Sequence, residues 1–329
     1  MVIPLLSVVI PTFKRPAYLS RAIASALESS LEGSVEVIVV PNGPDNSWKE
    51  VMAEFESDLR VKWYPVDDGG GAYARNYGFK HVSGEYIRFL DDDDYLHVEE
   101  CRSQLELALK HGLDVCSGAI DIDDGSSKFV KRLFQPDTND VVVAALSPSR
   151  MTATHAHIYK RSFLVGVEWD ASLPVRQDVV WFMRVSVLKG IKWSAIDYSV
   201  GAWVQHYGER VSRGRDPGQQ ALSHTAELII SLAEGLGSEG RLTEARKIAA
   251  ADGLWGCIQK GLRYDVAYWR KTAATANILA PSRTPPSKIY SCRMVKSLDP
   301  LFVETLLIPA RWLYHPLRKL LEGIGINRV

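Results

Sequence analysis

The sequence predicts an α/β fold, in which a mostly parallel sheet is flanked by helices and followed by a helical extension. Three observations lead to this prediction. Short apolar runs alternate with helix-like segments through the first ninety residues, which is the pattern of a parallel sheet. Beyond residue 214 the chain becomes rich in Ala and Leu, with helical periodicity. The composition, 46% hydrophobic and 24% charged, is that of an ordinary globular protein.

The expected strands are short apolar runs rich in β-branched residues, as in a parallel sheet that helices cover on both faces. In chain order they are Ser7–Ile10, Val35–Val40, Arg60–Tyr64, Glu85–Leu90 and Asp114–Asp121. Helices are expected between these strands, where apolar residues recur every three or four positions. They are Tyr18–Leu27, Trp48–Glu56, Ala72–Val82 and Glu99–His111.

The chain is expected to have two parts, residues 1–214 and residues 215–329. In the second part, helical periodicity runs through 219–279, with a break near Gly235–Gly240. The tail from Lys288 holds seven Lys and Arg against three Asp and Glu, and its leucines recur near helical spacing. Because these charges forbid a membrane span, we expect the tail to lie in the plane of the lipid headgroups. The alternative is that the leucines pack on the protein or on another copy of it.

Composition and charge exclude several classes of protein. The 39 Lys and Arg balance the 39 Asp and Glu, so the chain lacks the basic surplus of a nucleic-acid-binding domain. No apolar stretch reaches the roughly 18–20 residues of a membrane-spanning helix, and the N-terminus has no signal-peptide pattern. The four cysteines form no CxxC pair, which is typical of reduced thiols in a cytoplasmic protein. The sequence leaves the oligomeric state open.

Four consecutive aspartates, Asp91–Asp94, follow the expected strand Glu85–Leu90. In an extended chain, alternate side chains share a side, which would pair Asp91 with Asp93 and Asp92 with Asp94. Carboxylates held together at the end of a buried strand repel one another, and a hard cation such as Mg²⁺ or Mn²⁺ relieves that repulsion. The alternative is a solvated acidic turn or a helix N-cap.

Three segments resemble, in order and spacing, the motifs of family 2 glycosyltransferases, which have the GT-A fold. They are Ser7–Pro16, Ala74–Gly78 and Gly84–Asp94, the last of which resembles the strand that bears the family's DXD metal motif. The resemblance implies an inverting, metal-dependent transfer of a sugar from a nucleoside-diphosphate sugar, with UDP as the default nucleotide and thymidine or guanosine diphosphate as the alternatives. It also implies a glycan or lipid-linked acceptor and a role in bacterial surface-polysaccharide synthesis.

The resemblance assigns expected roles to individual residues around the donor. The nucleotide is expected to contact Pro11, Thr12, Phe13, Arg75, Asp91 and Asp92. The metal is expected to contact Asp93 and His206. Where the family often has Val-Asp-Asp-Gly-Ser, this chain has Val-Pro-Asn-Gly-Pro; Asn42 can still donate and accept hydrogen bonds at the edge of a base.

Two further residues are expected on the acceptor side. Asp178 begins a helix-like segment and matches one carboxylate of the family's Glu-Asp pair, whose other position is Gln177 here. A helix N-terminus favours an ionised carboxylate, which is the form that a general base requires. The alternative is a simple helix cap. His155 is a candidate contact for the acceptor.

Other classes of function predict other patterns. Gly69–Ala74 matches the spacing of a dinucleotide fingerprint, but it does not follow the first strand, where that fingerprint belongs. A nucleotidyltransferase would have a glycine-rich loop after the first strand. A sugar-nucleotide-binding protein without catalysis would lack the metal motif or the base. The sequence therefore favours a glycosyltransferase over an NAD-dependent oxidoreductase and over these two alternatives.

Overall fold

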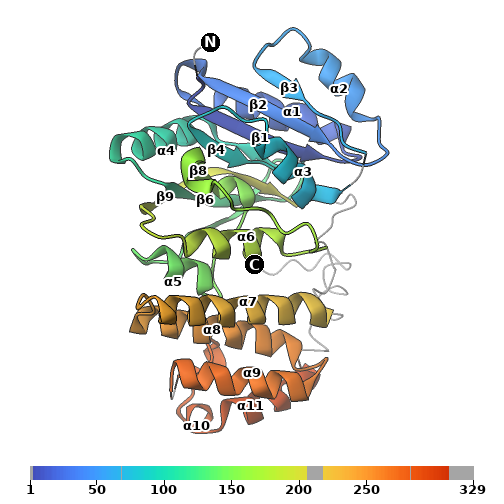
Figure 1. Cartoon of the computed structure of the whole chain (residues 1–329). Helices are drawn as coiled ribbons and strands as arrows, with labels where there is room; N and C mark the ends of the chain where they lie inside the picture. The colour runs from blue at the N-terminus through green and yellow to red at the C-terminus, as the bar shows by residue number, and fades with distance from the viewer. Residues whose placement is uncertain (1–2, 68, 206–217, 282, 311–329) are drawn as a thin grey trace. The chain divides into compact units, whose positions relative to one another are not determined.

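The computed structural model describes residues 3–67, 69–205, 218–281 and 283–310. The chain forms two compact units, one of Met1–Ala145 with Ser149–Arg215 and one of Leu146–Pro148 with Asp216–Val329 (Figure 1). The first unit contains the sheet, and the second consists of helices. The predicted α/β class with a helical C-terminal region is therefore confirmed.

The sheet of the first unit has the strand order β3-β2-β1-β4-β8-β6-β9-β5, with β7 paired to β6. Strands β1 to β4 pair in parallel with one another, as predicted. The sequence did not predict the strands β5, β7, β8 and β9. Of these, β5, β7 and β8 pair antiparallel to their neighbours, whereas β9 pairs in parallel with β6. The strands are β1 (Leu6–Thr12), β2 (Val35–Pro41), β3 (Val61–Trp63), β4 (Tyr86–Phe89), β5 (Tyr95–Leu96), β6 (Val115–Asp123), β7 (Phe129–Leu133), β8 (His157–Lys160) and β9 (Trp193–Val204).

Helices cover both faces of this sheet. Because successive strand residues point to opposite faces, Val8 packs in one apolar cluster and Val9 in the other. The first cluster includes residues of α1, α2 and α4, and the second includes residues of α3 and α6. The helices of this unit are α1 (Pro16–Glu28), α2 (Trp48–Glu54), α3 (Gly70–Phe79), α4 (Val98–His111), α5 (Val141–Leu146, whose last residue falls in the second unit) and α6 (Gln177–Ser186).

Helix α3 lies unusually close to the sheet because of one glycine. A Cβ atom at Gly78 would come within 2.5 Å of Cγ1 of Val9 on β1, a distance that real Cβ atoms essentially never show. The predicted helix was Ala72–Val82. The helix begins two residues earlier, at Gly70, and ends three residues earlier, at Phe79. This shift starts the helix within the glycine run, next to the carboxyl edge of the sheet.

The second unit contains three long helices, with α8 packed against both α7 and α9. The predicted break near Gly235–Gly240 is confirmed, since α7 ends at Ser238 and Thr243 caps the next helix. Its core contains the buried indoles of Trp255 and Trp269. The elements are α7 (Gly218–Ser238), α8 (Glu244–Gly261), α9 (Val266–Leu279), α10 (Arg293–Lys296) and α11 (Pro300–Leu306). Among the described residues, no helix is both long enough and apolar enough to span a membrane.

Candidate functional site

The candidate site lies where β1, β2 and β4 end. Thr12 and Pro41 are partners in the parallel register of β1 and β2, so the loops that follow leave the sheet side by side. The backbone N and the side-chain Nδ2 of Asn42 both donate to Thr12 O, each at 3.0 Å. Asn42 therefore fastens the two loops together, and one hydrogen of its side-chain amide is engaged in doing so.

An aromatic ring and a small cavity lie at the start of these loops. The Phe13 ring is 41% exposed and packs over Gly43, where a Cβ atom would be 3.0 Å from Cε2 of Phe13. A cavity of about 150 Å³ lies beside it, lined by Pro41, Gly43, Pro44, Asp45, Asn46, Trp48, Pro65, Val66 and Asp67. This part of the edge offers an exposed ring and a polar hollow to a planar ligand.

The four aspartates form a turn between β4 and β5 rather than a continued strand. The backbone N of Asp94 donates to Asp91 O at 3.1 Å. The turn brings one carboxylate oxygen each of Asp91, Asp93 and Asp94 within 4.8 Å of one another. The expected pairing of Asp94 with Asp92 was wrong, because alternation applies to an extended chain and the turn ends it.

Asp92 is not part of this group of three; its carboxylate contacts the loop after β1. It accepts hydrogen bonds from Thr12 Oγ1 at 2.8 Å, Phe13 N at 3.3 Å and Arg15 Nη1 at 3.0 Å. Burial raises the pKa of Asp92 to about 7, against the nearby Arg15 charge, and the charge of Asp93 adds to the rise. In this structure Asp92 therefore holds the loop that begins with Thr12 and Phe13.

Two arginines balance the acidic residues. Arg15 Nη1 lies 3.0 Å from Asp92 Oδ1 and 3.0 Å from Asp93 Oδ2, and Arg75 forms an ion pair with Asp91. Although burial favours the neutral form of Asp91, the adjacent Arg75 outweighs it and lowers the pKa of that carboxyl. The Arg75 guanidinium also lies 4.7 Å from the centre of the Trp169 ring. Sequence reasoning found Arg75 but missed Arg15.

His155 lies beneath the acidic residues. Its Nδ1 is 3.3 Å from Asp94 Oδ2, and its side chain has no exposed surface. Burial lowers the pKa of His155 to about 3, so the imidazole is neutral near pH 7. A side chain without exposed surface offers no contact to an acceptor in this conformation, which differs from the expected role of His155. The expected metal ligand His206 lies outside the described residues.

Asp178 occupies the first turn of α6, as its sequence pattern predicted. Its Oδ2 accepts a hydrogen bond from Thr152 Oγ1 at 2.7 Å, and the side chain is partly exposed. The preceding residue, Gln177, accepts from Arg75 Nη1 at 3.2 Å. Through Gln177 and Arg75, the start of α6 is therefore connected to Asp91 and the other carboxylates.

The arrangement fits a divalent cation. Carboxylate oxygens are the ligands that Mg²⁺ and Mn²⁺ prefer, and Asp91, Asp93 and Asp94 can supply three from one turn. Asp92, Asp93 and Asp94 are each 3% exposed, so the alternative of a solvated acidic turn is wrong. A partly exposed carboxylate, Asp178, stands in the first turn of α6, and the preceding Gln177 connects this turn to Asp91 through Arg75.

Comparison with known proteins shows which family the chain resembles. The family model for glycosyl transferase family 2 matches residues 7–191. An uncharacterized glycosyltransferase of Rickettsia bellii is 27% identical over 189 residues, which are 54% of this chain and 27% of that protein. An uncharacterized glycosyltransferase of Haemophilus influenzae is 32% identical over 120 residues, which are 36% of this chain and 48% of that protein. The chain thus spans half or less of the length of these curated relatives.

The fold also matches that of a solved glycosyltransferase structure. The crystal structure of Staphylococcus aureus TarS 1–349 in complex with UDP-GlcNAc aligns with a TM-score of 0.59 at 18% identity. The alignment covers 83% of this chain and 90% of TarS 1–349, and it confirms the predicted GT-A architecture. Because the family model covers more than half of the chain and spans the acidic turn and the start of α6, the chain belongs to glycosyl transferase family 2.

Proposed function

We propose that this chain transfers a sugar from a nucleoside-diphosphate sugar to a hydroxyl of a glycan or lipid-linked acceptor, with inversion at the anomeric carbon. The observation that supports this most directly is the group of three carboxylates, Asp91, Asp93 and Asp94, within 4.8 Å of one another in a family 2 domain. Mg²⁺ or Mn²⁺ is the cation proposed for it. When bound there, such a cation supplies positive charge that stabilises a leaving diphosphate.

Different residues around this group bind different parts of the donor. Phe13 offers an exposed ring to the nucleotide, beside Pro11, Thr12 and Asn42. Arg75 supplies a guanidinium next to Asp91, at the place expected for the diphosphate. Bidentate arginine contacts are a common means of binding phosphate.

Asp178 is the proposed general base. It removes the proton of an acceptor hydroxyl, whose oxygen then attacks the anomeric carbon opposite the leaving nucleoside diphosphate. A single displacement of this kind inverts the configuration. Thr152 Oγ1 donates to one carboxylate oxygen of Asp178, which orients the group and leaves its other oxygen for the substrate.

UDP is the proposed donor nucleotide. The sequence resemblance favours it, and the crystal structure of TarS 1–349 contains UDP-GlcNAc. The cytoplasm, where nucleotide sugars are made, is the proposed location, and surface-polysaccharide synthesis is the proposed setting.

We also propose that the tail from Lys288 lies against a membrane surface; its part from residue 311 onward lies outside the described residues. Four apolar side chains at a spacing of four residues are 47% to 80% exposed: Met294, Leu298, Phe302 and Leu306. Exposed rows of large apolar side chains mark interaction surfaces. Lys288, Arg293 and Lys296 lie along the same segment, and each basic residue near an anionic leaflet adds about 1 kcal/mol of attraction. A lipid-linked acceptor would make this location useful.

Flotation with phosphatidylglycerol vesicles at low salt tests the membrane proposal. The full chain should float, and the double variant Phe302→Asp/Leu306→Asp should not. Ile278→Asp is the matched control, because Ile278 is also exposed, at 79%, but lies on α9 outside the row. If the double variant floats as well as the wild type, the row does not bind lipid.

A thermal-shift screen of sugar nucleotides, with and without Mn²⁺, tests the transferase proposal. A ligand at a hundred times its Kd stabilises the fold by about 2.7 kcal/mol. UDP-sugars should raise the melting temperature more in the presence of Mn²⁺. Release of UDP on addition of an acceptor distinguishes transfer from binding without catalysis, and release of pyrophosphate from a sugar phosphate and a nucleoside triphosphate would indicate a nucleotidyltransferase instead.

A further inference from the structure

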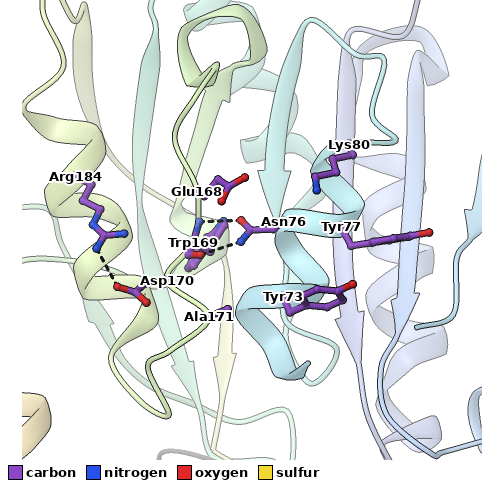
Figure 2. A pocket seen from close by; sticks show the side chains of 9 residues that line it. All are labelled: Tyr73, Asn76, Tyr77, Lys80, Glu168, Trp169, Asp170, Ala171 and Arg184. Carbon is purple, nitrogen blue, oxygen red and sulfur yellow. Dashed lines mark hydrogen bonds and ion pairs between the residues drawn. The ribbon is translucent and has the colours of Figure 1, made fainter. Parts of the chain in front are cut away.

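A second, larger cavity lies beside the donor site, between α3 and the loop that precedes α6 (Figure 2). Its volume is about 420 Å³, within the usual size range of ligand pockets. Figure 2 shows side chains from α3 on one side and from residues 168–171 and α6 on the other. The lining residues are Tyr73, Asn76, Tyr77, Lys80, Glu168, Trp169, Asp170, Ala171 and Arg184.

Hydrogen bonds, an ion pair and a stacked ring fix the wall of this cavity. Asn76 Nδ2 donates to Trp169 O and Trp169 N donates to Asn76 Oδ1, both at 2.8 Å. Arg184 Nη2 lies 2.9 Å from Asp170 Oδ2. The Trp169 ring stacks on Trp181, with ring centres 4.6 Å apart. A preformed wall costs a ligand little ordering free energy.

A row of aromatic rings continues from the cavity along α3. Tyr73 and Tyr77 lie one turn apart on α3, and His81 follows two residues after the helix ends. The ring centres of Tyr73 and Tyr77 are 6.3 Å apart, and those of Tyr77 and His81 are 4.8 Å apart. Tyr64 stacks on His81 at 4.0 Å. Tyr73 is 42% exposed, so the row is open to solvent where it meets the cavity.

The chemistry of this surface suits a carbohydrate. Aromatic rings offer flat apolar faces to the C–H groups of a sugar ring, and the amide, carboxylate and guanidinium groups between them can bind hydroxyls. Lys80 and Arg184 balance Glu168 and Asp170, so the lining has no net charge to favour a polyphosphate or a nucleic acid. The elongated row favours a chain of sugars over a single one.

The cavity is also close to the proposed reaction centre. Trp169 forms part of its wall, and the Arg75 guanidinium, which pairs with Asp91, lies 4.7 Å from the centre of the Trp169 ring. A Cβ atom at Gly71, at the start of the same helix, would meet Arg75 Nη1 at 3.2 Å and Gln177 Oε1 at 3.5 Å. One layer of side chains therefore separates the cavity from the residues around the donor.

We propose that the cavity and the aromatic row of Tyr73, Tyr77, His81 and Tyr64 bind an uncharged acceptor glycan, several sugars long, outside the donor site. This inference rests on the proposed glycosyltransferase function. The bound glycan is anchored on α3 while the hydroxyl that reacts extends toward Asp178. Length of the acceptor, rather than its terminal sugar alone, then determines affinity.

Saturation-transfer difference NMR with neutral tetrasaccharides tests this proposal without relying on catalysis. The probes are linear tetrasaccharides of glucose, mannose, galactose and N-acetylglucosamine. At least one should bind the wild-type protein, and binding should be about tenfold weaker in Tyr73→Ala/Tyr77→Ala, which removes two stacking faces. Tyr264→Ala is the matched control, because Tyr264 is a 39% exposed tyrosine in the second unit. UDP affinity should be the same in all three proteins.

Two outcomes would overturn the proposal: no tetrasaccharide binds the wild-type protein, or one binds equally well to Tyr73→Ala/Tyr77→Ala. Failure of the transferase proposal has a different signature. In that case UDP would fail to bind the wild-type protein in the presence of Mn²⁺, whatever the tetrasaccharides do. Transfer assays then supply a second readout: the double variant should raise the KM for a tetrasaccharide acceptor and leave its kcat close to that of the wild type.

Discussion

The two compact units differ in what they bury. The first buries charge at the carboxyl edge of its sheet, including Asp92, Asp93 and Asp94. The second buries mainly alanine, leucine and the large indoles of Trp255 and Trp269; among its described residues, Asp252 and Glu304 are the buried acids. Asp252 is paired with Arg283, while Glu304 accepts hydrogen bonds from Gln259 and Tyr290.

This difference in buried residues indicates that the first unit contains the functional site, whereas the core of the second unit contributes mainly stability. Burying an ionised group costs free energy unless it is paired and hydrogen-bonded. The first unit meets that cost with Arg15, Arg75 and the Thr12 hydroxyl, all at the edge where ligands of parallel sheets bind. We therefore expect substitutions at this edge to change activity more than stability, and substitutions in the core of the second unit to do the reverse.

The largest expected effect is on catalysis. Asp178→Asn keeps the size of the side chain but removes its basicity, so transfer should fall about 10²–10⁴-fold, while UDP affinity and melting temperature stay close to wild type. Initial rates of UDP release with a saturating acceptor measure the change. Asp197→Asn, at an exposed position on β9, is the control and should retain full activity. Transfer by Asp178→Asn at more than a tenth of the wild-type rate would make Asp178 only a helix cap.

A second prediction concerns pH and the buried charge itself. Because the pKa of Asp92 is raised from its ordinary 3.8 to about 7, the folded protein keeps this proton to about pH 7, whereas the unfolded chain releases it near pH 4. The contribution of Asp92 to the free energy of unfolding therefore decreases as pH rises from about 4 to 7. In urea unfolding in EDTA, the free energy of unfolding of Asp92→Asn should therefore rise relative to that of the wild type as pH increases across this range. Parallel curves for the two proteins would contradict the raised pKa.

The smallest expected effect on activity comes from the second unit. A Cβ atom at Gly261 would lie 2.1 Å from Cε2 of Trp269, so Gly261→Ala must displace a buried indole. Overpacking of this kind costs about 1–3 kcal/mol, which calorimetry detects as a lower melting temperature. Gly235→Ala is the control, because no atom lies within 4 Å of its Cβ position, and it should be neutral or stabilising. Equal melting temperatures of the two variants would show that this core tolerates the clash.

Patterns of apolar residues along the chain predicted several strands of the sheet correctly. The apolar runs predicted β1, β2 and β4, and the family resemblance assigned Pro11–Phe13, Asn42 and the aspartates to the donor. The strands β5, β7, β8 and β9 were not predicted, because their pairing depends on contacts with residues far along the chain, such as Tyr95 with Ala202.

Several contacts in the site depend on turns and on contacts between distant residues, which the sequence pattern alone does not predict. Asp94 joins Asp91 and Asp93 because the chain turns, and Arg15, which pairs with Asp92, follows Lys14, which has a positive φ of 55°. The larger cavity brings Tyr73 together with Trp169, almost a hundred residues later. Arg88, a charged residue inside the apolar run of β4, is buried. Its position in that run was a signal of buried polar contacts that the sequence analysis did not use.

The most direct test of the central claim is calorimetric titration of UDP, with and without Mn²⁺, into the wild-type protein and Asp93→Ala. The claim is that the acidic turn of the first unit binds a nucleotide together with a divalent cation. The wild type should bind UDP at least tenfold more tightly with Mn²⁺, and Asp93→Ala should lose that gain while keeping a melting temperature close to wild type. An equal gain from Mn²⁺ in both proteins would contradict the assignment of Asp93 and of the acidic turn as the metal site.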